Sequence, residues 1–267
     1  MTEIFDQLTA DTLFLKGDYQ AAFEMYFKGA TEYRDSRAAF DLAYMYHRGF
    51  YVPVNGLMAR KFYHAASAMD GGAALFNLAL LHLRGIGDAV DFAAAYDCMK
   101  RAAADGCVDA QLYLGTAYTL GCVFDPINIE CLSMIPFPRV IKRDPETMML
   151  CGTGADAAME DRRFEIIEAD EVDAVEMFRQ AASHKDDTYI NEQIGAAKLT
   201  LGQALIEGVG MEYSPRKGYR LIERAAKEHD SKEAAHFLLT HRDEAQIYGI
   251  DATKTAFLLG EKEGENS

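Results

Sequence analysis

Side chains that could do chemistry are scattered along this sequence, beginning with five cysteines. Their number is odd and no two form a CxxC pair, so neither a disulfide framework nor a zinc site of the usual spacing is predicted. A free cysteine packs as a small hydrophobic residue. We therefore expect reduced, buried thiols at Cys98, Cys107, Cys122, Cys131 and Cys151.

The stretch CGTGAD, residues 151–156, places a cysteine beside a glycine turn. It lacks the sequence of a phosphate-binding loop and the GxGxxG fingerprint of a dinucleotide site. A nucleophilic Cys151 would need a histidine within reach, which the sequence does not show. His229, His236 and His241 do not form an HExxH pair, and only the first spacing fits one helical face. The sequence thus predicts no catalytic residue, metal ligand or cofactor.

Composition narrows the class of partner. The 267 residues carry a formal net charge of −15, which disfavours binding along nucleic acid or an anionic membrane. The acidic N-terminal stretch lacks the basic and apolar regions of a secretory signal, and no apolar run is long enough to cross a bilayer. We expect a soluble, cytoplasmic protein whose partners are proteins or peptides with basic or mixed-charge surfaces.

The elements that position these side chains repeat along the chain. Leu42, Leu78 and Leu114 lie 36 positions apart, each four residues after an alanine and four before a ring residue. Spacings of four place these residues on one helical stripe, with His82 in the ring position as an interior histidine. Glycines seven residues after each leucine are expected to end the helices with a positive φ: Gly49, Gly85 and Gly121.

A second alanine-rich helix follows each glycine turn, with Asn55 and Asp91 in N-cap positions. Further copies are found at 197–226, with Ser214 as the cap, and near the start, where Asp18 precedes the second helix of a truncated or capping unit. Small alanines at matching positions allow close helix packing. These residues indicate an array of two-helix units.

The repeated pattern resembles that of the Sel-one-like repeats, a branch of the tetratricopeptide-like α-solenoids. The resemblance covers about residues 18–121 and 170–240, and segments 74–103 and 197–226 follow the family pattern closely. The family tryptophan is replaced by Phe62, Cys98, Met177 and Leu221, and only Leu114 and Leu201 are followed by the family glycine. The resemblance implies an all-α fold, a right-handed α-solenoid of about four to five antiparallel helix pairs.

Two insertions interrupt the expected solenoid of residues 1–240. The longer, about 124–167, separates the helices of the third full unit. Its prolines and apolar residues indicate an ordered excursion with a packing or partner role, and a disordered tether is the alternative. RFEIIEA within it is expected to form a short strand or helix. A shorter insertion lies at about 184–191. Residues 241–260 are predicted to cap the array, and 261–267 to form a frayed acidic tail.

The predicted function is that of a non-catalytic interaction scaffold that binds a peptide or protein segment in the concave groove, at the insertion, or at both. One stripe of the first helices supplies the candidate contacts: Asp41, Met45, Arg48, Asn77, Arg84 and Tyr113. Arg48 and Arg84 are also compatible with being simply solvated charges. An enzyme or small-molecule site at the 124–167 insertion is the alternative, and self-association through that insertion is a third possibility.

Overall fold

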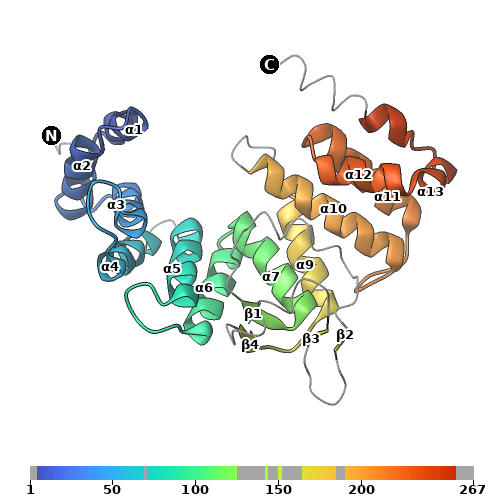
Figure 1. Ribbon diagram of the computed structural model, residues 1–267, viewed down its shortest axis with the longest axis horizontal. Helices are drawn as coiled ribbons and strands as arrows, with labels where there is room; N and C mark the ends of the chain where they lie inside the picture. Colours follow the sequence, from blue (N-terminus) through green and yellow to red (C-terminus); the bar gives the residue numbers. More distant parts are fainter. Residues whose placement is uncertain are drawn as a thin grey trace. The chain divides into compact units, whose positions relative to one another are not determined.

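The computed structural model describes residues 5–68, 71–124, 142–143, 150–151, 164–184 and 190–256. Helices predominate in these residues (Figure 1). They are α1 (Gln7–Leu15), α2 (Tyr19–Thr31), α3 (Ser36–Arg48), α4 (Gly56–Ser67), α5 (Gly72–Arg84), α6 (Phe92–Ala104), α7 (Val108–Leu120), α9 (Glu171–Ala182), α10 (Asn191–Glu207), α11 (Pro215–Glu228), α12 (Lys232–Thr240) and α13 (Arg242–Ile247).

The helices pack as sequential pairs within two compact units, Met1–Cys107 and Val108–Ser267. The first unit holds the pairs α1/α2, α3/α4 and α5/α6, and the second holds α7/α9, α10/α11 and then α12 with α13 (Figure 1). The predicted fold class, an α-solenoid of helix pairs with a long insertion in the third full unit, is confirmed. The first pair is complete, because α1 precedes the segment that the sequence indicated as a second helix.

Caps and glycines end the helices where the sequence predicted. The side chains of Asp18, Asn55, Asp91 and Asp170 each accept a hydrogen bond from a backbone N–H in the first turn of the following helix. Gly49, Gly85 and Gly208 end α3, α5 and α10 in the left-handed conformation. Ser214 precedes α11, but its side chain makes no capping hydrogen bond, and Pro215 begins that helix instead.

The repeated leucine and alanine positions form the core. Leu42, Leu78, Leu114 and Leu201 are all buried. The alanines four residues earlier are at most 1% exposed, which leaves no room for a larger side chain: Ala38, Ala74, Ala110 and Ala197.

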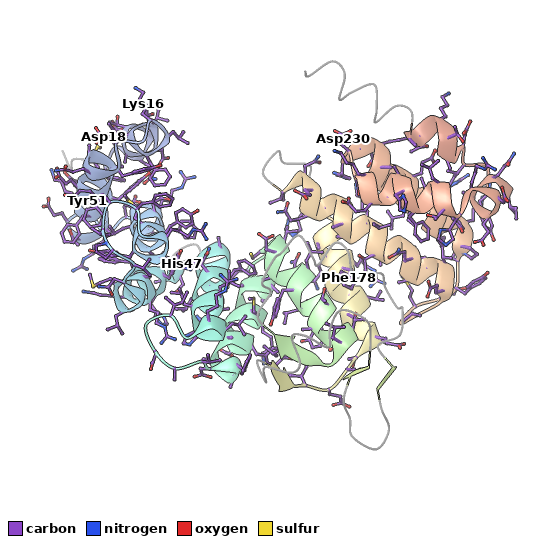
Figure 2. All side chains as sticks on the ribbon, in the orientation of Figure 1. Lys16, Asp18, His47, Tyr51, Phe178 and Asp230 are labelled. Carbon is purple, nitrogen blue, oxygen red and sulfur yellow. The ribbon has the colours of Figure 1, made fainter. Side chains whose placement is uncertain are left out.

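Glycine at two positions allows closer helix contact in the second unit. A Cβ on Gly115 of α7 would lie 2.8 Å from the ring of Phe178, which extends from α9 (Figure 2). A Cβ on Gly202 of α10 would lie 2.4 Å from Ile222 Cγ1 of α11. The matching positions of the first unit are the buried Ala43 and Ala79. At Gly115 and Gly202, glycine is required because the partner side chain lies directly over the helix backbone.

The turns after α5 and α10 pack on the start of the preceding second helix. Gly87 lies so close to Gly56 that a Cβ would be 2.4 Å from the Gly56 carbonyl carbon. In the second unit, a Cβ on Gly210 would be 2.2 Å from the carbonyl oxygen of Glu171. Gly56 and Glu171 both occupy the first helical position after a cap. The same backbone contact thus recurs in both units and stacks one pair on the next.

The long insertion leaves and rejoins the third pair at one place. β1 (Cys122–Phe124) pairs antiparallel with β4 (Phe164–Ile166), with Val123 opposite Glu165. RFEIIEA, which was expected to form a short strand or helix, contains the strand β4. A second antiparallel pair joins β2 (Lys142–Arg143) to β3 (Leu150–Cys151). The rest of the 124–167 insertion lies outside the described residues. Because β1 and β4 hold its two ends together, α7 and α9 still pack as an ordinary pair.

The shorter insertion is partly helical. α10 has 17 residues, whereas α3, α5 and α7 each have 13, so the extra length adds a turn at the N-terminus of α10. Residues 185–189 lie outside the described part. At the C-terminus, α13 and a helical segment at 252–256 fall within the predicted capping region. Residues 257–260 of that region and the predicted tail at 261–267 lie outside the described residues.

Candidate functional site

The first helices of the first unit line a cavity of about 470 Å³, which we call the α1–α3 groove. α1 and α3 supply most of its wall, and α5 closes one side. Aromatic, acidic, amide and basic side chains meet there. The lining residues are Gln7, Asp11, Phe14, Leu15, Tyr26, Ser36, Arg37, Phe40, Asp41, Ala66, Ala73 and Ala74.

One amide joins two carboxylates in the groove. Nε2 of Gln7 donates to Oδ1 of Asp11 and to Oδ2 of Asp41, at 2.7 Å in both cases. The hydroxyl of Tyr26 also donates to Oδ1 of Asp11, at 2.8 Å. These hydrogen bonds link α1, α2 and α3, because each helix supplies at least one partner. They also hold two acidic side chains close together in a partly buried site.

Burial raises the pKa of Asp41 to about 6, and the charge of Asp11 adds to the effect. The hydrogen bond from Gln7 and the charge of Arg37 act in the opposite direction. A carboxyl group whose pKa is raised on folding binds its proton more tightly in the folded protein. Its ionisation therefore lowers stability as the pH rises from about 4 through 6. At neutral pH the groove holds a carboxylate whose charge the fold does not fully compensate.

We expect Asp41→Asn to raise the free energy of unfolding at pH 7.5 by about 1–2 kcal/mol, because the uncharged amide avoids this cost while the residual exposure limits the gain. The gain should shrink at pH 4.5, where the carboxyl of the folded protein is already protonated. Urea unfolding followed by circular dichroism at both pH values measures it. Asp97→Asn on the exposed face of α6 is the control and should show no such pH dependence. Equal destabilisation by Asp41→Asn at both pH values contradicts the interpretation.

The structure places the predicted contact residues in different environments. Asp41 lines the groove. Asn77 is half-buried and its side-chain amide donates to the carbonyl of Ala73 one turn earlier. Arg48 and Arg84 are exposed at the ends of α3 and α5, outside the groove lining.

Met45 and Tyr113 are both fully buried, so neither is open to a partner. Met45 lies three residues after Leu42, on the same face of the helix, and therefore packs in the core. The matching residues in the other units are also fully buried: Leu81, Ala117 and Ala204.

Most of the residues that line the α1–α3 groove were not predicted from the sequence. Gln7 and Asp11 belong to α1, which ends at a glycine turn, Gly17 with a positive φ, but lacks the repeated leucine seven residues before that glycine. Arg37 and Phe40 precede Asp41 by four and one positions on α3. The i and i+4 spacing of Gln7 with Asp11, and of Arg37 with Asp41, is the signal that would have placed each pair on one helical face.

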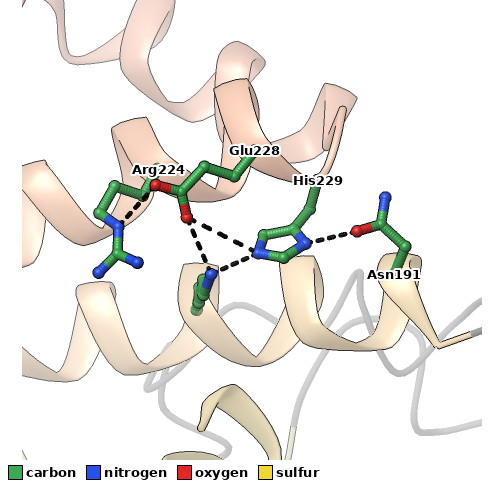
Figure 3. A network of polar contacts seen from close by, with 5 residues as sticks. Asn191, Arg224, Glu228 and His229 are labelled. Carbon is green, nitrogen blue, oxygen red and sulfur yellow. Dashed lines mark hydrogen bonds and ion pairs between the residues drawn. The ribbon is translucent and has the colours of Figure 1, made fainter. Parts of the chain in front are cut away.

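A polar network in the second unit is the other cluster of chemically capable side chains (Figure 3). Lys198 of α10 has a side chain only 6% exposed, and its Nζ donates to Oε2 of Glu228 at 3.1 Å and contacts Nε2 of His229. An ammonium group only donates, so Nε2 accepts and Nδ1 of His229 donates to Oδ1 of Asn191 at 2.6 Å. Arg224 donates to Glu228 and is the main reason that the pKa of this carboxyl falls to about 2.

This network ties α11 to the lengthened start of α10, where Asn191 is the first residue. The positions that match Lys198 in earlier units hold Ala39, Leu75 and Gln111, all buried. An amine nucleophile must be open to substrate. Lys198 is instead enclosed by a carboxylate and a histidine, so we interpret the network as a link between helices.

The remaining candidates from the sequence are structural. His82 is partly buried, and its Nδ1 accepts from Nη2 of Arg60 at 3.1 Å, which fits the interior role expected for it. Cys98 is buried, and burial raises the pKa of its thiol, whereas Cys107 is partly exposed. The side chains of Cys122, Cys131 and Cys151 lie outside the described residues. Within the described part, no group of three or more His, Cys, Asp or Glu side chains is arranged to hold a metal ion.

None of the described helices combines the length and the apolar character needed to span a bilayer.

The segments of the chain that match a known protein family follow the helix pairs closely. The Sel1 repeat family matches residues 13–32, 36–71, 72–107, 163–186 and 196–230, which together make up more than half of the chain. The second and third of these segments coincide with the pairs α3/α4 and α5/α6. No curated protein matches the chain.

Several solved structures are similar, including the following two. A Sel1 repeat protein from Oxalobacter formigenes has 21% sequence identity and a TM-score of 0.58, over 82% of this chain and 48% of that one. A protective antigen present in uropathogenic Escherichia coli strains, which displays an SLR fold, has 21% identity and a TM-score of 0.39, over 91% of this chain and 52% of that one. The chain thus spans about half the length of both proteins, and the first likeness concerns the fold alone. From the repeat match and the helix pairs, the chain belongs to the Sel1 repeat family.

Proposed function

We propose that this chain is a non-catalytic scaffold that binds a peptide or protein segment in the α1–α3 groove. The observation that carries the proposal is the cavity itself, which is formed by the first helices of adjacent pairs. A volume of about 470 Å³ suits one or two side chains of a bound segment. Repeat proteins of this kind stack their units into extended binding surfaces.

The character of the wall supports protein binding. Leu15 lines the groove and is 85% exposed, although it is a large apolar residue. Phe14 and Phe40 supply aromatic surface beside the charges of Arg37 and Asp41. Protein interfaces concentrate their binding free energy in such mixtures of aromatic, arginine and apolar anchors. A bound segment that covers Leu15 would remove a large apolar surface from water.

Part of the predicted stripe extends this surface. Arg48 lies at the far end of α3 from Ser36, roughly 18 Å along a helix of 13 residues. We propose that Asn77, Arg48 and Arg84 contact more distant parts of a longer partner. With a net charge of −15, neither nucleic acid nor a membrane is proposed as a ligand. A cytoplasmic location is part of the same proposal.

The insertion at 124–167 stays the alternative site, for an enzyme reaction, a small molecule or self-association. Most of its residues lie outside the described part, including Cys131. Its described portions are strand segments, and the pairing of β1 with β4 holds the two ends of the insertion together. No observation on the described residues favours chemistry there over the groove.

A matched pair of variants tests the groove. Random dodecapeptides displayed on phage are selected on the full chain, and the strongest binders are then synthesised and titrated by fluorescence anisotropy. We expect Leu15→Ser to weaken binding about tenfold, since truncating an interface anchor costs more than 1 kcal/mol. Leu57→Ser is the control, because Leu57 is 68% exposed on α4 and lies outside the groove lining. Peptides that bind both variants equally well would show that the groove is not the binding site.

A further inference from the structure

We propose that the α1–α3 groove recognises a lysine or arginine side chain of the bound segment and holds it between Asp11 and Asp41. This inference rests on the proposed function, since it names the chemistry of the segment that the groove receives. Two observations carry it. Acceptor oxygens in the groove lack a donor from the described residues, and the carboxylates of Asp11 and Asp41 are negatively charged.

Three acceptor oxygens in the groove have no hydrogen-bond donor among the described residues. Oε1 of Gln7 is buried and unpaired. Asp11 accepts both of its hydrogen bonds on Oδ1, which leaves Oδ2 without a donor from the described part of the chain. Asp41 accepts only on Oδ2, which leaves Oδ1 in the same state. The buried Oε1 of Gln7 costs free energy in this state, and the two carboxylate oxygens can still accept hydrogen bonds, so the site favours a ligand that brings donors.

The missing partner is a donor that is also positively charged. An ammonium group has three N–H donors and a guanidinium has five, and neither has an acceptor. Gln7 supplies one neutral N–H₂ group to two carboxylates, so it satisfies hydrogen bonds without cancelling charge. A cation between Asp11 and Asp41 would relieve the repulsion between them and form charge-assisted hydrogen bonds. A neutral or acidic side chain offers neither gain.

Arg37 does not supply this charge from within the chain. It lines the same groove and is exposed, yet no ion pair joins it to Asp11 or Asp41 in the described residues. Its charge acts on Asp41 only through space. Arg37 thus leaves the carboxylates available, and its position also disfavours a partner that carries several adjacent cations.

The apolar part of the wall fits the rest of a basic side chain. Lysine and arginine have hydrocarbon stems that pack on apolar surface while the charged end reaches polar groups. Phe14, Leu15 and Phe40 line the groove together with the carboxylates. A segment that carries a basic residue next to an apolar one would therefore satisfy both parts of the wall at once.

Binding of such a side chain depends on pH in a defined direction. Asp41 is surrounded by Asp11 of α1, Tyr26 of α2 and Tyr63 of α4, and by Asp35 and Arg37 at the start of α3. Burial in this setting raises the pKa of Asp41 to about 6 in the free protein. A bound cation favours the ionised form, so the affinity should fall as the pH is lowered from 7.5 to 5.5.

The test uses the dodecapeptides selected by phage display on the full chain. Each strong binder is synthesised with its basic residue and with norleucine, an uncharged residue of similar length, in its place. We expect norleucine to weaken binding at least tenfold, and Asp41→Asn or Asp11→Asn to do the same for the basic peptide. The two changes together should cost little more than either alone, because they remove the same interaction. Asp97→Asn makes the same change of charge outside the groove and is the control.

Two results overturn the inference in different ways. If binders depend on Leu15 but bind equally well with norleucine, or to Asp41→Asn, the groove receives another kind of side chain and the proposed function stands. If no selected peptide depends on Leu15, both the inference and the proposed function fail. Circular dichroism of each variant shows that a loss of binding does not come from unfolding.

Discussion

Gly202→Ala is expected to lower the free energy of unfolding of the α10/α11 pair by about 2 kcal/mol, a typical cost for an overpacked interior. Alanine normally stabilises a helix interior by about 1 kcal/mol relative to glycine, so the expected sign is opposite to helix propensity. The physical reason is that a Cβ would lie 2.4 Å from Ile222 Cγ1 and 2.9 Å from the carbonyl oxygen of Gly218. Urea unfolding of the full chain measures the change.

A second substitution separates this contact from any general effect. Ile222→Ala alone removes a fully buried side chain and should itself cost about 2–5 kcal/mol. The double variant Gly202→Ala/Ile222→Ala removes the nearest clash, so it should cost less than the sum of the two single changes. Additive costs, or a more stable Gly202→Ala, contradict the close approach of α10 and α11.

His229→Leu is expected to destabilise the second unit by about 3 kcal/mol, because it leaves a buried ammonium short of an acceptor. Nε2 of His229 accepts from Lys198, and Nδ1 donates to Asn191 (Figure 3). The leucine fills most of the space but replaces neither hydrogen bond. Thermal unfolding followed by circular dichroism at pH 7.5 measures the loss.

Removing both partners should recover most of that loss. Lys198→Met/His229→Leu leaves no buried cation, and the matching positions of earlier units already hold the apolar Ala39 and Leu75. Lys227→Met is the control, because Lys227 pairs with Glu223 on the surface and should change stability by no more than about 0.5 kcal/mol. A double variant as unstable as His229→Leu would show that the network is not paired as described.

The helix pairs were predictable because glycine and alanine mark them at fixed offsets. The spacing of Leu42, Leu78 and Leu114 also predicted α7, which lies outside the segments matched by the Sel1 repeat family. The pairing of β1 with β4 was not predictable, because strands so short carry no periodic signal and the paired residues lie 40 to 44 positions apart. For RFEIIEA the sequence indicated a short regular element and left open whether it is a strand or a helix.

The groove was less predictable than the fold, for two physical reasons. A helix stripe shows which residues share a face, but Met45 shares its face with Leu42 and is fully buried, whereas Asp41 is only partly buried and lines the groove. The groove also depends on α1, whose sequence lacks the repeat pattern, so Gln7 and Asp11 could not be aligned with any other unit. The charged side chains of the groove come together from different helices. Residue spacing along one helix does not show which helices pack against each other.

Hydrogen–deuterium exchange with a selected peptide bound tests most directly the claim that the first helices of the first unit form the binding surface. The full chain is compared with and without a saturating concentration of the peptide. We predict slower exchange in Gln7–Leu15 and Ser36–Arg48 when the peptide is bound, and unchanged exchange rates in α9 to α13. Protection confined to the 124–167 insertion or to α10 and α11, with none in α1 and α3, would contradict it.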